Sequence, residues 1–171
     1  MNKKYKVICL IHEAFEDLEF WYPVLRCMEA NVEVVVVGEY KGRYTGKYGV
    51  HADAGYTYDE IDYKNYDGLL IPGGWAPDKM RRFPKVLEIT RHFVESNKPV
   101  GTICHAGWVL ASADCIKGRL LTSTPGIKDD LIHAGAKWAD EPVVMDGNLI
   151  SSRSPADLPY YMKKFLEVLF K

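Results

Sequence analysis

The sequence has no apolar run long enough to cross a bilayer, which takes about 20 residues as a helix. The apolar stretch nearest the N-terminus, Val7 to Ile11, has five residues and is followed by acidic side chains. We interpret it as a first strand and not as a signal peptide, and we expect no membrane partner. The formal net charge of −1 provides no general attraction to nucleic acid, so no nucleic-acid partner is expected either.

Cysteine and histidine patterns that mark metal or disulfide sites are also missing. No C-x-x-C pair occurs, and no small-scaffold cysteine pattern is present. The histidines outside the motif described below, which show no ligand spacing, are His12, His51, His92 and His133. No G-x-G-x-x-G or Walker sequence follows the first strand, which argues against a flavodoxin-like nucleotide binder. We therefore expect no metal, no cofactor, and reduced thiols in a cytoplasmic protein.

What the chain contains is an alternation of apolar strands and amphipathic helices over 171 residues, of which 47% are hydrophobic and 26% charged. The predicted strands are 6–11, 32–37, 66–71, 99–103, 120–123 and a hairpin over 143–150, and the predicted helices are 16–30, 84–96, 108–113, 127–134 and 158–170. Residues 39–58, rich in Gly and Tyr, indicate an antiparallel excursion from the main sheet. This alternation predicts one domain, residues 1–171, of doubly wound α/β type with a mostly parallel sheet.

The segment V-G-T-I-C-H-A-G-W-V-L, residues 100–110, predicts a strand that turns directly into a helix at Cys104. Such a nucleophile elbow leaves its turn residue exposed above the sheet, and small residues after it, Ala106 and Gly107, allow close packing. The N–H groups of the following helix favour a thiolate there. The alternative is a buried cysteine at a strand end, which is the commoner role of a free cysteine.

Two further loops follow strands that end at the same edge of the predicted sheet, where sites form in such folds. One carries Glu16, a candidate acid beside the thiol; the other carries Gly73 and Gly74. With Cys104 as nucleophile, backbone N–H groups of these glycines and of His105 are candidates for an oxyanion hole. His105 is the candidate base, although neighbours after a tight turn need not face each other, and it would need an acidic orienter.

Each of these residues has a plainer interpretation. Glu16 alone is an acid at a helix start, where the helix dipole favours it. Gly73 and Gly74 alone make a turn, and Asp78 alone is a solvated charge or a helix N-cap. The combination of the three loops is more specific than any one of them.

Five motifs together resemble the ThiJ/PfpI superfamily, and most closely its branch of PfpI-like intracellular cysteine proteases and deglycases. They are F-E-D-L-E at 15–19, I-P-G-G-W-A-P-D at 71–78, I-C-H-A-G-W-V-L at 103–110, T-P-G-I-K-D-D at 124–130 and S-S-R-S-P-A-D-L at 151–158. The resemblance covers nearly the whole chain, in order. It implies a flavodoxin-like three-layer sandwich related to glutamine-amidotransferase domains.

The resemblance also implies roles for particular residues. It makes Cys104 the nucleophile, His105 its neighbour and Glu16 the acid beside the thiol. The resemblance further implies that an acid from an adjacent subunit, at the position of Asp78, is the partner of the histidine. It therefore implies a homo-oligomer, a dimer or a hexamer. Relatives often carry Glu where this chain has Asp78, an aromatic residue at Thr124, and Gly at Ala106.

We therefore expect a cysteine-dependent hydrolase of the PfpI kind. Its substrates would be peptides or small carbonyl adducts, as for an intracellular protease, a protein deglycase or a cofactor-independent glyoxalase-like enzyme. The alternative is a stress-response protein that uses the reactive cysteine as a redox sensor, or that acts as a holdase, without turnover.

Overall fold

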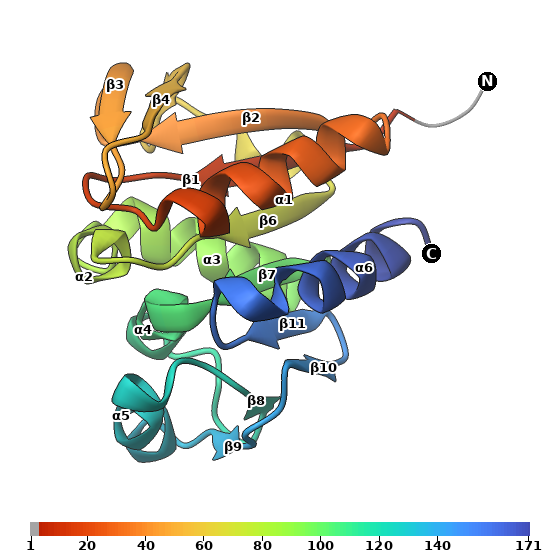
Figure 1. The fold of residues 1–171 in the computed structure, drawn as a ribbon. Helices are drawn as coiled ribbons and strands as arrows, with labels where there is room; N and C mark the ends of the chain where they lie inside the picture. Colours follow the sequence, from red (N-terminus) through yellow and green to blue (C-terminus); the bar gives the residue numbers. More distant parts are fainter. Residues whose placement is uncertain (1–3) are drawn as a thin grey trace.

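The computed structural model describes residues 4–171 and contains one seven-stranded sheet with helices on both faces (Figure 1). The strands of this sheet are β1 (Lys6–Leu10), β2 (Glu33–Gly38), β5 (Tyr56–Thr57), β6 (Gly68–Ile71), β7 (Val100–Ile103), β10 (Val143–Asp146) and β11 (Leu149–Ser152). Their order across the sheet is β10-β11-β7-β6-β1-β2-β5, and all neighbours are parallel except the β10–β11 hairpin. The predicted α/β class with a mostly parallel sheet is confirmed.

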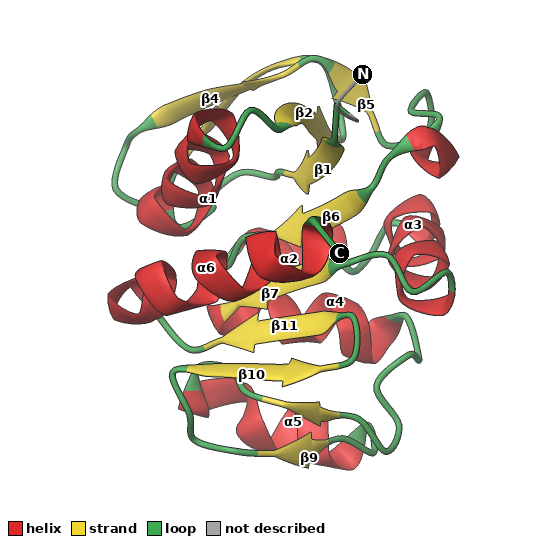
Figure 2. Cartoon of the chain, turned by 90° about the vertical axis from the view of Figure 1, so that its right-hand side faces the viewer, coloured by secondary structure: helices red, strands yellow, loops and turns green. Residues whose placement is uncertain are grey.

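Helices cover both faces of the sheet, which gives the three layers that the family resemblance implied (Figure 2). The helices are α1 (Asp17–Glu29), α2 (Ala76–Met80), α3 (Pro84–Glu95), α4 (Gly107–Ser112), α5 (Lys128–His133) and α6 (Leu158–Leu169). Single 3-10 turns cover Tyr63–Asn65, Cys104–Ala106, Pro125–Ile127 and Pro155–Asp157. Helices α1 and α6 pack together on one face, and α3 packs with α4 on the other. Within residues 4–171, no helix is long and apolar enough to cross a membrane.

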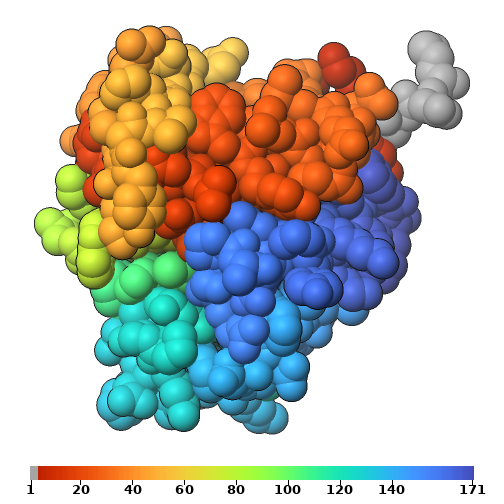
Figure 3. Space-filling model, in the orientation of Figure 1, coloured from red at the N-terminus to blue at the C-terminus, as the bar shows by residue number. Residues whose placement is uncertain are grey.

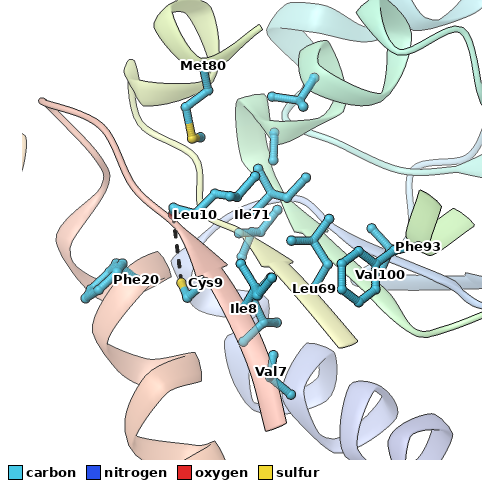
Figure 4. Close-up of a cluster of buried hydrophobic side chains, with 14 of the residues drawn as sticks. Val7, Ile8, Cys9, Leu10, Phe20, Leu69, Ile71, Met80, Phe93 and Val100 are labelled. Atoms are coloured by element: carbon cyan, nitrogen blue, oxygen red, sulfur yellow. Dashed lines mark hydrogen bonds between the residues drawn. The ribbon is translucent and has the colours of Figure 1, made fainter. Parts of the chain in front are cut away.

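Strand β1 lies between β6 and β2 in the interior of the sheet, and its side chains contribute to the core on both faces. Successive side chains of a strand point to opposite faces, so Cys9 and Leu10 separate as Figure 4 shows. Phe20 of α1 packs on one side, and Met80 of α2 and Phe93 of α3 pack on the other. Each of these side chains is at most 1% exposed. The apolar strand β1 is therefore buried on both faces, as is typical of parallel strands, whereas most of β2 is only partly buried.

Two predicted segments lie outside the main sheet or only partly within it. The excursion over 39–58 forms an antiparallel hairpin of β3 (Gly42–Thr45) and β4 (His51–Ala54), and then returns to the sheet edge as β5. The strand predicted at 120–123 is shorter, β8 (Leu120–Leu121), and pairs with β9 (Lys137–Trp138) in a separate two-stranded sheet.

The strand order places the loops that carry the candidate site residues side by side. The chain runs from β1 to β2 on one side and returns to β6 on the other side of β1, so strand order switches between β1 and β6. Strand β7 is the next neighbour of β6. Since the three strands are parallel, their C-terminal ends open at one edge, which is where ligands bind in such sheets.

Candidate active site

Cys104 occupies a strained position directly after β7. Its φ angle is +59°, in the left-handed region that L-residues other than glycine rarely adopt. A 3-10 turn over Cys104–Ala106 then leads into α4. Gly107 allows α4 to approach α5, because a Cβ on it would lie 3.0 Å from the side chain of Leu131. The predicted elbow is therefore present, with strain of a kind that collects at functional sites.

His105 faces the thiol, which the sequence left open. Its Nδ1 lies 3.2 Å from Sγ of Cys104. The imidazole ring lies between Trp75 and Trp108, with centroid distances of 5.1 and 5.0 Å. Burial, and then the charge of Lys47, lower the pKa of His105 below its ordinary value. The ring is therefore neutral at pH 7 and can accept a proton from the thiol.

The acid beside the thiol is Glu19, whereas the sequence prediction named Glu16. Glu16 is the N-cap of α1, and its Oε2 accepts a 2.8 Å hydrogen bond from the N–H of Glu19. This bond turns the Glu16 carboxyl toward the helix end. Glu19, three residues on and 1% exposed, extends to Cys104. The correction has a simple cause: the helix begins one residue later than predicted, which makes Glu16 a cap.

The environment of Glu19 keeps its carboxyl group protonated at neutral pH. Burial, followed by the nearby charge of Glu16, raises the pKa of Glu19 to about 8. The thiol of Cys104, the N–H of Gly73 and the charge of Lys47 act in the opposite direction. Among residues 4–171, neither Glu19 oxygen has a partner at ordinary hydrogen-bond geometry. Glu19 is therefore in close polar contact with these groups, without a formed hydrogen bond.

The thiol itself is not strongly acidic in this resting arrangement. Burial, and then the charge of Glu19, raise the pKa of Cys104 to about 12, while the N–H groups of Gly74 and His105 act to lower it. The sequence had favoured a thiolate because of the helix N-terminus. Burial outweighs those N–H groups.

The expected oxyanion hole is only partly as predicted. The N–H groups of Gly74 and His105 point toward Sγ of Cys104. Gly74 has a φ of +74° and forms a β-bridge with Phe15, which holds its N–H in place. Gly73 differs, because its N–H acts on the Glu19 carboxyl. The structure thus groups Gly74 with His105 and places Gly73 beside the acid.

Asp78 does not contact His105 within one chain. It lies in the short helix α2, where its Oδ2 pairs with Arg82 four residues later. Among the described residues, no carboxylate hydrogen-bonds to His105. That a neighbouring subunit provides this acid stays a prediction, because it concerns a second chain.

Three side chains at the site were not singled out from the sequence as functional: Lys47, Trp75 and Trp108. Trp75 and Trp108 stood inside the quoted motifs, directly after Gly74 and four residues after Cys104. Trp108 is held by a 2.7 Å hydrogen bond from its Nε1 to Asp130. Lys47 lies in the Tyr-rich segment 39–58. No local sequence pattern indicates that this segment folds back over a distant site.

Comparison with known proteins shows the family of the chain. Residues 5–168 match the DJ-1/PfpI family. The chain is 43% identical over 164 residues to a protein of Pyrococcus horikoshii named Deglycase PH1704, covering 96% of this chain and 99% of the relative. It is 38% identical to the Putative cysteine protease YraA of Bacillus subtilis, covering 96% and 98%.

A solved structure supports the same fold. It is a two-domain protein of Anabaena variabilis with DJ-1/ThiJ/PfpI-like and ferritin-like domains, and it matches this chain with a TM-score of 0.96 and 40% identity. The match covers 98% of this chain and 48% of that protein. The similarity therefore concerns one of its two domains.

Proposed function

This chain belongs to the DJ-1/PfpI family, and we propose that it is a cysteine-dependent hydrolase acting on small carbonyl adducts of amines or on peptides. The names of its relatives, deglycase and putative cysteine protease, support an enzyme of hydrolase type. The observation that carries the proposal is the contact of Cys104 with His105 on one side and with Glu19 on the other. A cysteine between a neutral base and a protonated acid supports a nucleophilic role for Cys104.

The proposed first step uses the two neighbours of Cys104 in different ways. Sγ forms a bond to the electrophilic carbon of the substrate, while Nδ1 of His105 accepts the thiol proton. The protonated carboxyl of Glu19 can donate a hydrogen bond to negative charge at sulfur before that bond forms, and it can transfer its proton to the departing amine as the carbon–nitrogen bond breaks. Water later cleaves the sulfur–carbon bond and releases the product.

Backbone donors would support charge that develops on the substrate oxygen. The N–H groups of Gly74 and His105 already point toward sulfur, and they can stabilise an oxyanion that forms beside it. Each such donor is worth about 10²–10³ in rate in well-studied enzymes. Gly73 is not assigned this role, since its N–H acts on Glu19.

A shared site between subunits is part of the proposal. Asp78 lies on a half-exposed position of α2, close in sequence to Trp75, whose ring contacts His105 at a tilt. A second copy could present its own Asp78 to a histidine that has no carboxylate partner among the described residues of its own chain. The active unit would then be a homo-oligomer.

The test is a substrate panel of methylglyoxal, methylglyoxal-treated amino acids and a fluorogenic peptide. We expect Cys104→Ala to reduce turnover at least about a thousandfold, because the nucleophile is lost. The matched control is Cys115→Ala. Cys115 is half-buried, and its thiol donates a hydrogen bond to the carbonyl of Leu110. Undiminished turnover in Cys104→Ala would contradict the proposal. Selective peroxide oxidation of Cys104 without turnover on any substrate would favour the redox-sensor alternative.

A further inference from the structure

A backbone ladder ties the β3–β4 hairpin to the site. The N–H of Ala14 donates to the carbonyl of Thr45 at 2.9 Å, and the N–H of Lys47 donates to the carbonyl of Phe15 at 2.7 Å. Phe15 in turn forms a β-bridge with Gly74, whose N–H points toward Cys104. Lys47 therefore belongs to an element that is hydrogen-bonded, through one intermediate strand segment, to the glycine loop of the site.

The turn that carries Lys47 is held in one conformation by a buried carboxylate. Asp17, 5% exposed, accepts hydrogen bonds from the N–H of Tyr48 at 2.9 Å and from that of Val50 at 2.8 Å. Gly46 lies so close to this carboxylate that a Cβ would stand 2.6 Å from its Cγ. Figure 3 shows the orange-yellow hairpin beside the start of α1 and reaching toward the yellow-green α2. The backbone of Lys47 is thus positioned by contacts on both sides.

The side chain of Lys47 extends toward Trp75, one of the two tryptophans beside His105. Its Nζ lies 5.7 Å from the ring centroid of Trp75, whose ring is tilted against that of His105. The ammonium group forms no ion pair with a carboxylate among the described residues. Its charge nevertheless acts on both Glu19 and His105, lowering the pKa of each. Beside Trp75 and His105 there is therefore a cation with no ion-pair partner among the described residues.

We propose that Lys47 is a specificity residue that binds a carboxylate of the substrate, so that the Cys104 site prefers electrophiles carrying a carboxylate beside the reacting carbon. Adducts of 2-oxo acids belong to this class; their neutral amides do not. The inference rests on the proposed function only in taking Cys104 as the reacting atom. Because Lys47 is exposed, solvent and salt screen its charge, and the preference is a severalfold effect.

The test compares two alkylating agents of nearly the same size, iodoacetate and iodoacetamide, in the intact protein. Sulfur forms a bond to the methylene carbon, the carbon–iodine bond breaks, iodide leaves and the thiol proton passes to solvent. The ratio of the two rates at a single pH cancels the thiolate fraction of Cys104. It therefore reports only how the site treats the negative charge of the reagent. Fragment-ion mass spectrometry separates modification of Cys104 from that of Cys115, which serves as an internal control.

We expect Lys47→Gln to lower the iodoacetate-to-iodoacetamide ratio at Cys104 about three- to tenfold, since a charge attraction is removed. The ratio at Cys115 should not change. The matched control is Lys164→Gln, at an exposed lysine of α6 that pairs with Glu167 and should leave both ratios as in the unaltered protein. Raising the salt concentration should reduce the ratio at Cys104 in the unaltered protein only.

An unchanged ratio at Cys104 in Lys47→Gln would overturn the inference. So would an equal fall at Cys115, because the effect would then be a general one of protein charge. Absence of turnover on the substrate panel would instead contradict the proposed function, and the alkylation ratio would be unaffected by that result. The two proposals can therefore fail separately.

Discussion

The carboxyl of Glu19 and the side chain of Cys104 lie against each other across Gly73, in a space that leaves no room for a side chain at position 73. A Cβ on Gly73 would stand 2.2 Å from Oε2 of Glu19 and 2.7 Å from Cβ of Cys104. The acid lies in the first turn of α1, the thiol directly follows β7, and the glycine lies in the loop after β6. Their contact explains why the pKa of Glu19 and that of Cys104 depend on each other.

Replacing each of the two glutamates should distinguish the acid beside the thiol from the helix cap. In the unaltered protein we expect activity to fall as pH rises through about 8, because Glu19 loses its proton there. Glu19→Gln should not show this fall. Glu19→Ala should reduce kcat/KM about 100-fold or more, since the side-chain hydrogen-bond donor beside the thiol is lost. The measurement is the pH profile of kcat/KM on the best substrate of the panel.

Glu16→Gln is the matched control, because its amide oxygen can still cap the helix. It should keep activity within about threefold and should move the alkaline limb to lower pH, as the charge that raises the pKa of Glu19 is removed. If Glu16→Gln abolished the alkaline limb and Glu19→Gln kept it, the assignment of the two carboxyls would be reversed.

The buried carboxyl of Glu19 should also make stability depend on pH. Its pKa is about 8 in the folded chain, against an ordinary value of 4.5. Between these values the folded state keeps a proton that the unfolded state has lost, so the free energy of unfolding falls as pH rises. The contribution is complete below about pH 4.5 and is lost above about pH 8, and it amounts to a few kcal/mol.

Urea unfolding at several pH values, on the unaltered protein and on Glu19→Gln, measures this contribution. The difference between the two free energies of unfolding should change steadily across the window, in the direction that weakens the unaltered protein at high pH. Parallel curves would show that Glu19 does not retain its proton.

The close approach at Gly73 predicts a large effect of a single methyl group. Gly73→Ala should displace Glu19 or Cys104, and so we expect turnover to fall at least about 100-fold together with a loss of stability of about 1–3 kcal/mol, as for other overpacked sites. Gly55→Ala is the matched control, because a Cβ there meets nothing within 4 Å. Activity in Gly73→Ala equal to that in Gly55→Ala would contradict the described contact.

A subunit-mixing experiment tests whether Asp78 acts across an interface. Cys104→Ala and Asp78→Ala should each be inactive alone. If Asp78 serves the neighbouring subunit of a dimer, a one-to-one mixture that exchanges subunits should recover about a quarter of the full activity, because hybrid dimers rebuild one intact site. Recovery is measured after mixing under conditions that allow exchange. Full activity of Asp78→Ala alone, or no recovery in exchanged hybrids, would exclude the shared site.

Much of the fold was predictable because its signals are local. The apolar run at 6–11 became β1 over Lys6–Leu10, and the helix predicted at 84–96 became α3 over Pro84–Glu95. The Asp146-Gly147 turn joins β10 and β11 as expected, with Gly147 at a φ of +59°. Periodicity and turn chemistry act over a few residues, and neighbouring residues alone therefore determine them.

The Glu16–Glu19 assignment could not be made in this way. The two acids are three residues apart, so both can lie on one side of a helix start. The N–H of Glu16 donates to the carbonyl of Gly73, a residue 57 positions away, and this contact fixes where α1 begins. The choice between them therefore depended on how the loops after β1 and β6 meet.

The sequence by itself determined the order of elements, the elbow at Cys104 and the family, because each follows from residues adjacent in the chain or from motifs in a fixed order. Only the tertiary structure decided which carboxyl meets the thiol, that His105 faces Cys104 between two tryptophans, and that Lys47 reaches the site. These contacts join loops far apart in the sequence. Their geometry is set by how parallel strands align their ends, and that information is not present in any one segment.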